Sequence, residues 1–122
     1  MKSKEELSMK FRKINLEENV EYDAKVVSWG VDDDKRFVRI FVEIEGLDNI
    51  QFLKCIRYSE FAPSALSNFC EMFDIINKNG DVDFDKLIDV DIVVTMNQGR
   101  DGNFYVADIY PENYEENEDE QD

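Results

Sequence analysis

The chain has 122 residues, 43% hydrophobic and 12% aromatic, with a net charge of −15, which allows one acidic domain with a hydrophobic core. It contains no histidine, so the commonest general base and the commonest transition-metal ligand are both missing. It has no apolar run near the roughly 18 residues of a membrane span and no secretory signal, so we expect a cytoplasmic protein (host cell cytoplasm if viral) without a membrane partner.

The net charge is concentrated in the second half of the chain. Residues 112–122 carry seven acidic side chains and no basic one. Residues 1–111 carry 14 basic and 22 acidic side chains, a net charge of −8, yet residues 1–58 carry 11 basic and 12 acidic ones. Blocks of like charge repel one another and stay solvated, so residues 112–122 are predicted to form a disordered acidic tail.

The first half of the chain predicts an N-terminal arm and three strands. Residues 1–19 place Leu7, Phe11 and Ile14 near helical spacing, which indicates an arm or a short helix. From Val20 the hydrophobic period changes to two, which predicts strands over 20–30, 37–44 and 50–58, with a bulge or bend at Gly30. In the second strand, one set of alternate residues is predicted to be buried: Val38, Ile40, Val42 and Ile44.

The second half predicts one helix and a hairpin. Apolar residues recur at helical spacing over 62–77, with Pro63 at the first helical position and a stop at Asn77–Gly80. Its predicted buried residues include Phe69 and Phe73. A short turn over 84–88 leads to strands over 90–96 and 104–110, joined by a Gly-rich loop.

The predicted element order is β-β-β-α-β-β, which makes the chain mainly β. This is the order of a five-stranded antiparallel barrel of the oligonucleotide/oligosaccharide-binding (OB) type with one capping helix, here spanning residues 20–111.

The sequence holds no motif that indicates catalysis or a metal. The acidic run at 81–85 starts like a calcium loop, but Lys86 and Ile92 stand where such a loop needs Gly and Glu. The glycines at 99 and 102 precede no helix that could bind phosphate. Nucleophilic side chains have no histidine partner. We therefore expect a binding protein, not an enzyme, with no metal and no cofactor, and with Cys55 and Cys70 as two reduced core thiols.

The outward face of the second strand is the candidate binding site. If its even-numbered residues are buried, Phe37, Arg39 and Phe41 point outward. Two exposed aromatics around an arginine favour stacking of unpaired bases, with Arg39 contacting phosphate. An alternative is that both phenylalanines pack under the N-terminal arm or at a subunit interface. The complete predicted nucleic-acid-binding set is Lys25, Trp29, Arg36, Phe37, Arg39, Phe41, Lys54, Arg57, Tyr58 and Arg100.

The strand order, the Phe37–Phe41 segment, the Gly99–Gly102 hairpin and the terminal acidic run resemble a phage-type single-stranded DNA-binding protein with an OB fold. This resemblance covers residues 20–122 in outline. It implies sequence-tolerant coating of single-stranded DNA in DNA replication or recombination, by a homo-oligomer whose acidic tail recruits replication or recombination proteins. One departure is the terminus, Asp119-Glu120-Gln121-Asp122, because bacterial members of the wider class end in an apolar dipeptide.

A second function class stays open. An acidic surface can mimic nucleic acid and bind a basic protein partner, which would make the chain an interaction or inhibitor protein. The predicted surface for that role is the tail together with Asp81, Asp83, Asp85, Asp89 and Asp91.

Overall fold

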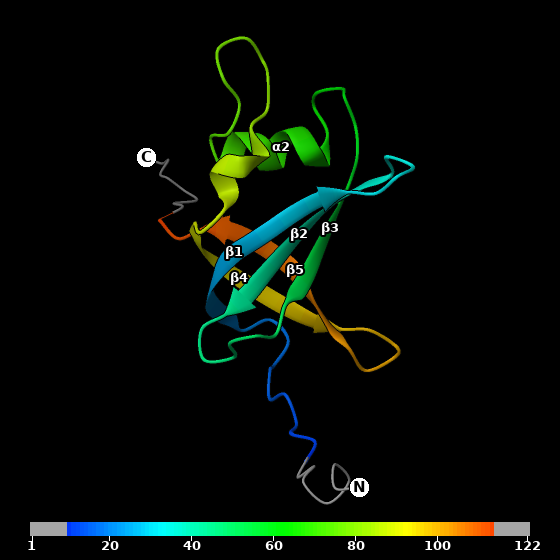
Figure 1. The fold of residues 1–122 in the computed structure, drawn as a ribbon, viewed down its shortest axis with the longest axis vertical. Helices are drawn as coiled ribbons and strands as arrows, with labels where there is room; N and C mark the ends of the chain where they lie inside the picture. The colour runs from blue at the N-terminus through cyan, green and yellow to red at the C-terminus, as the bar shows by residue number, and fades with distance from the viewer. Residues whose placement is uncertain (1–9, 114–122) are drawn as a thin grey trace, which may run out of the picture.

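In the computed structural model, which describes residues 10–113, the chain forms one curled five-stranded sheet with an α-helix at one end (Figure 1). The strands run in the order β3-β2-β1-β4-β5, and every neighbouring pair is antiparallel. The predicted mainly β class and the β-β-β-α-β-β order are confirmed. The elements are β1 (Glu21–Val31), β2 (Phe37–Ile44), β3 (Phe52–Arg57), α2 (Ala65–Met72), the 3-10 helix η1 (Phe84–Leu87), β4 (Asp91–Gln98) and β5 (Phe104–Pro111).

The hydrophobic core lies inside the curl of the sheet. On β2, Val38, Ile40 and Val42 are fully buried and Ile44 is 3% exposed, as their alternation predicts. Direct partners across antiparallel strands share a face, so Ile56, opposite Val38 on β3, also points inward. The remaining buried core residues of the strands include Val26, Phe52, Ile92, Val94, Met96, Val106 and Ile109.

The sheet does not close into a barrel. Strands β3 and β5 lie side by side, but in the part of the chain that the structure describes they are the two edges of the sheet and share no ladder. The word barrel in the predicted fold therefore applies only loosely, because the sheet is curled but not closed. One side chain crosses the gap: the Lys54 ammonium donates a hydrogen bond to the Ala107 carbonyl oxygen at 2.7 Å. A buried or half-buried carbonyl at an edge needs such a donor.

The helix is shorter than the predicted 62–77. It begins after Ser64, whose side chain accepts the Ser67 N–H while the Ser67 hydroxyl accepts the Ser64 N–H, so Pro63 lies before the N-cap and not at the first helical position. It ends at Met72 because Asp74 takes a left-handed conformation (φ 56°) and the chain turns back. Phe69 is buried as predicted, whereas Phe73 is only partly buried.

The bulge or bend predicted at Gly30 is wrong, and of the predicted arm or short helix the described residues 10–17 form an arm. The register shift in β1 lies between Val26 and Ser28, so the bulge is at Val27 and Gly30 sits in regular pairing. Residues 10–17 form no helix; instead Ile14 and Leu16 pack against the core. Residues 1–9 and 114–122 lie outside the described residues, and with them the first nine residues of the predicted arm and most of the predicted acidic tail. No helix in the described range is long and apolar enough to cross a membrane.

Candidate nucleic-acid interface

The outer side of β2 and β3 carries four of the ten predicted residues: Phe37, Arg39, Phe41 and Arg57. Phe37, Arg39 and Phe41 alternate with the fully buried residues of β2, so they point away from the core. Across the ladder, Phe37 lies opposite Arg57 and Arg39 lies opposite Cys55. Paired residues point to the same side. We call this surface the Phe37–Phe41 face and define it as Phe37, Arg39, Phe41, Leu53, Cys55 and Arg57.

The two phenylalanines are half-buried, but they are not part of the core. The apolar residues that pack against the core include Trp29, Tyr58 and Phe73, and neither Phe37 nor Phe41 belongs to that set. Their rings therefore lie on the outer surface of the sheet, partly covered by neighbours. The predicted alternative, that the N-terminal arm covers them, gains no support from the described part of the arm, because Ile14 and Leu16 pack on the core and Phe11 is 90% exposed.

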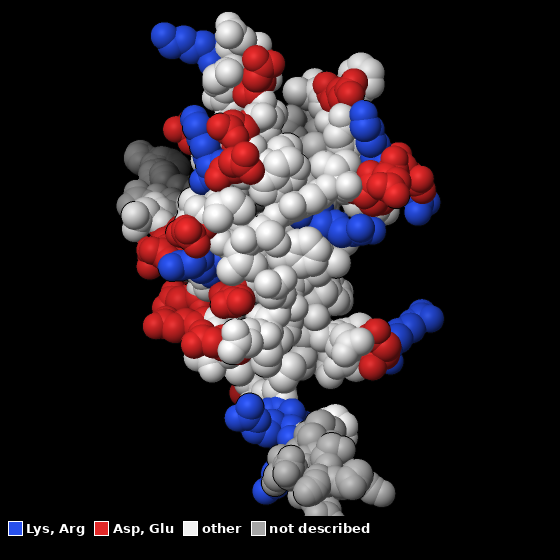
Figure 2. All heavy atoms as spheres, viewed as in Figure 1, with Lys and Arg blue, Asp and Glu red and all other residues white. Residues whose placement is uncertain are grey.

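Charge is arranged around this face. Figure 2 looks onto the outer side of β1, β2 and β3, and its middle is largely uncharged, with basic atoms over β3 and most acidic groups at the periphery. The only charged side chains of the Phe37–Phe41 face are Arg39 and Arg57. These six residues are apolar or basic, but Asp32 lies 3.9 Å from Arg39, Glu43 is the next outward residue of β2, and the whole chain has a net charge of −15.

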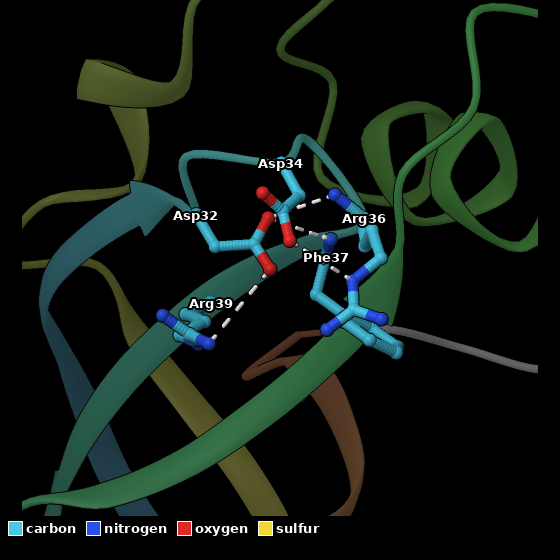
Figure 3. A network of polar contacts seen from close by, with 5 residues as sticks. All are labelled: Asp32, Asp34, Arg36, Phe37 and Arg39. Atoms are coloured by element: carbon cyan, nitrogen blue, oxygen red, sulfur yellow. Dashed lines mark hydrogen bonds and ion pairs between the residues drawn. The ribbon is translucent and has the colours of Figure 1, made fainter.

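The loop between β1 and β2 is held by one carboxylate, Asp32 (Figure 3). Asp32 Oδ1 accepts the backbone N–H of Arg36 at 2.8 Å and of Phe37 at 3.2 Å. Its Oδ2 lies 3.9 Å from Arg39 Nη2. The pKa of Asp32 is lowered, and the largest cause is the hydrogen bond from the Phe37 N–H. Desolvation of the carboxylate opposes this effect and raises the pKa. The Arg36 N–H and the charges of Arg39 and Arg36 lower the pKa further. Asp32 therefore fixes the start of β2 and positions Arg39 from one side.

Replacing Asp32 with Ala should lower the melting temperature at pH 7. A carboxylate whose pKa is lower in the folded state stabilises the fold above its unfolded pKa, about 3.9, and loses this effect as the pH falls through the folded pKa. We therefore expect the gap in melting temperature between wild type and Asp32→Ala to narrow below about pH 4. Thermal denaturation at pH 7 and pH 3 measures this, with Asp33→Ala, an exposed neighbour, as control. An equally wide gap at both pH values would contradict the role of the ionised carboxylate.

Two residues of the predicted set lie on the other side of the sheet. Trp29 pairs with the buried Ile40. Its Nε1 donates to Asp85 Oδ1 at 2.9 Å, and its ring centroid lies 4.9 Å from that of Phe84. Trp29 thus joins β1 to η1 at the end of the sheet. Lys54, on β3, also pairs with Ile40, and its ammonium donates a hydrogen bond to the Ala107 carbonyl of β5. The structure does not bring Trp29 or Lys54 to the Phe37–Phe41 face.

Lys25 lies in an acidic groove at the other end of the strands. It is exposed on β1 and pairs with Glu43 and Asp91. The groove has a volume of about 450 Å³ and brings six carboxylates around this one amine. Phosphate would be repelled there. The carboxylates belong to Asp23, Glu43, Glu45, Asp48, Asp91 and Glu112.

The other three predicted residues surround the face or lie further away. Arg36 is exposed in the β1–β2 loop, with Nε 3.6 Å from Asp34 Oδ2. Tyr58 follows β3, and its hydroxyl donates to Glu60 Oε2 at 2.9 Å, which raises the pKa of Tyr58. Arg100 is exposed in the β4–β5 loop. Arg36 directly precedes β2, and its 70% exposed side chain lies beside the Asp34 carboxylate.

The two cysteines differ, against the prediction that both are core thiols. Both are free; Cys70 is buried and Cys55 is exposed. Burial, with a smaller effect of the Glu71 charge, raises the pKa of the Cys70 thiol to about 11. Sequence reasoning therefore missed Cys55 and its neighbour Leu53 as parts of the face. The period of β3 contained the signal, because the inward set Phe52, Lys54 and Ile56 leaves the odd-numbered residues outside.

Within residues 10–113, no group of three or more carboxylate, thiol or imidazole side chains is placed to hold a metal ion. The arrangement offers stacking, an apolar surface and two guanidinium groups, which suits a planar, negatively charged ligand. Comparison with protein families, with curated proteins and with solved structures finds no match for this chain.

Proposed function

We propose that this protein binds single-stranded DNA, with little sequence preference, through the Phe37–Phe41 face. The observation that carries the proposal is the placement of Phe37 and Phe41 outside the core with Arg39 between them on one strand. Aromatic stacking contributes roughly 1–3 kcal/mol for each base and accepts every base, because each has a π-face. Arg39 and Arg57 supply contact with phosphate or guanidinium stacking.

The net charge does not exclude this function. Phosphate contacts supply most nonspecific affinity for DNA, so a chain of charge −15 repels DNA at long range. At 0.15 M salt, however, exposed charges further than about 8 Å away are largely screened. The local surface and the stacking contribution then decide binding. In the same proposal, the chain acts in DNA replication or recombination as a homo-oligomer, and its acidic terminus contacts partner proteins.

The exposed thiol of Cys55 provides a test, because Cys55 lies opposite Arg39 on the proposed face. In the folded protein at pH 7.5, a maleimide should label Cys55 and leave Cys70 unlabelled, since Cys70 is 1% exposed and its pKa is about 11. Denatured protein should take up two labels. A saturating dT oligonucleotide should slow the labelling of Cys55, because the bound strand covers it.

Cys55→Ser is the control for assignment of the label, and the native variant should take up none. Fluorescence anisotropy of the same oligonucleotide reports binding independently of labelling. Binding without protection of Cys55 would place the interface elsewhere. No binding at low salt would contradict the proposed function itself.

A second candidate function is supported by the acidic groove around Lys25. Its six carboxylates on a fixed scaffold suit a basic segment of a protein partner. The five aspartates predicted for that role are only partly available, because Asp83 caps η1 and Asp85 accepts the Trp29 N–H. A chain that binds a lysine-rich peptide and no oligonucleotide would favour this candidate over DNA binding.

A further inference from the structure

Gly30 is an unusual residue for its position in the fold. It lies near the end of β1, an 11-residue strand, and pairs directly with Arg39. Glycine inside a strand weakens the sheet, because it loses more chain entropy on folding and has no side chain to pack. A glycine there usually indicates a bulge, a bend, or a place where a backbone or a ligand comes close.

The structure removes the first three of these explanations. The bulge of β1 lies at Val27, and the pairing of Trp29, Gly30 and Val31 with β2 is regular. The glycines of positive φ are Gly46, Gly80 and Gly102, so the backbone of Gly30 suits other residues. Among residues 10–113, no atom lies within 4 Å of the position that a Cβ atom on Gly30 would take, so no neighbouring backbone in this range requires the small residue. Within the fold, a larger residue would fit and would favour the strand.

We propose that Gly30 is the point where the bound strand comes closest to the protein backbone, with a nucleotide lying over Gly30 beside the Arg39 side chain. This inference rests on the proposed function and adds a contact residue to the same face. The missing side chain leaves open space directly beside Arg39, the cation between the two phenylalanines. A β-branched residue at position 30 would fill that space and separate the ligand from the sheet.

The experiment compares Gly30→Val, Gly30→Ala and wild type in the full chain. Gly30→Val should melt about 2–8 °C higher, because it restricts the unfolded chain and favours β-structure. Its affinity for a fluorescent dT oligonucleotide should fall about tenfold, the loss of one stacked base. The melting temperature and the affinity of Gly30→Ala should both lie between those of wild type and Gly30→Val. Asn97→Val, which places the same side chain on the outer face of β4 opposite Tyr105, should leave the affinity unchanged.

The outcomes separate this inference from the proposed function. If Gly30→Val melts as expected and binds like wild type, Gly30 is not a contact, while a loss of binding in the Phe37 and Phe41 variants keeps the proposed function. A lower melting temperature of Gly30→Val would show that the fold itself requires glycine there, which overturns the inference. Absence of binding by wild type overturns both.

Discussion

Replacing both Phe37 and Phe41 with Ala should weaken oligonucleotide binding by about 2–6 kcal/mol, taking 1–3 kcal/mol for each lost stack. The melting temperature should fall only slightly, because both rings lie outside the core cluster and are half-covered by neighbours. A core phenylalanine replaced by Ala would cost about 3–5 kcal/mol of stability. Anisotropy titration with fluorescent dT oligonucleotide and thermal denaturation of the same samples measure the two quantities.

Phe61→Ala is a matched control for this double variant. Phe61 is 82% exposed in the loop between β3 and α2, outside the Phe37–Phe41 face. Its replacement should change neither the melting temperature nor the affinity. If the double variant unfolds, both rings support the fold and the face is not free for a ligand. If it folds and binds as before, the DNA contacts another surface.

Replacing Ile40 with Ala should destabilise the fold and leave oligonucleotide binding unchanged, which is the reverse of the result expected for the Phe37 and Phe41 double variant. Ile40 is fully buried between Arg39 and Phe41, so its truncation leaves a cavity in the core. The expected loss is about 2–5 kcal/mol of unfolding free energy. For a domain of about 100 residues each kcal/mol lowers the melting temperature by roughly 4–8 °C. Urea denaturation gives the free energy directly, and binding measured on the folded fraction at low temperature should match wild type.

Ile40→Val removes one methyl(ene) group and should lower the free energy of unfolding by only about 0.5–1.5 kcal/mol. We expect this variant to stay folded even if Ile40→Ala unfolds. The pair therefore reports burial at position 40 whatever the stability of the Ala variant. A loss of binding in the folded Ile40→Val variant would contradict the division of β2 into an inner and an outer side. Unchanged stability of both variants would contradict the burial of Ile40.

Alternation along β2 determined both the core and the candidate face. Side chains of a strand point to opposite sides with a period of two, so once Val38 and Ile40 are assigned to the core, Phe37, Arg39 and Phe41 must lie outside. The same local logic gives the turn at 99–103, where Gly102 takes a left-handed conformation (φ 86°) that glycine readily adopts. The alternation of β2 and the turn at 99–103 depend only on residues that are close together in the chain, so both could be predicted from the sequence.

The helix end was harder to predict, because the apolar spacing continues beyond it. Ile75 and Ile76 extend the helical pattern, yet the chain turns at Asp74. Ile75 is buried in the core although it lies beyond the end of the helix. An apolar residue is favoured by burial whichever element supplies it. Hydrophobic spacing therefore placed the end of the helix too late, whereas reading Pro63 as the first helical position placed its start too early.

The tertiary structure alone decided which basic and aromatic residues share a surface. Lys54 and Arg57 are three residues apart in β3, but one bridges to β5 while the other lies beside Phe37. Trp29 lies on the side of β1 opposite to the Phe37–Phe41 face because a single bulge at Val27 shifts the alternation by one residue. A one-residue shift moves every later side chain to the other face, and the composition around Val27 does not reveal it. The sequence by itself determined the class, the core of β2 and the presence of an aromatic and basic strand, whereas the register between strands decided which residues can meet a ligand together.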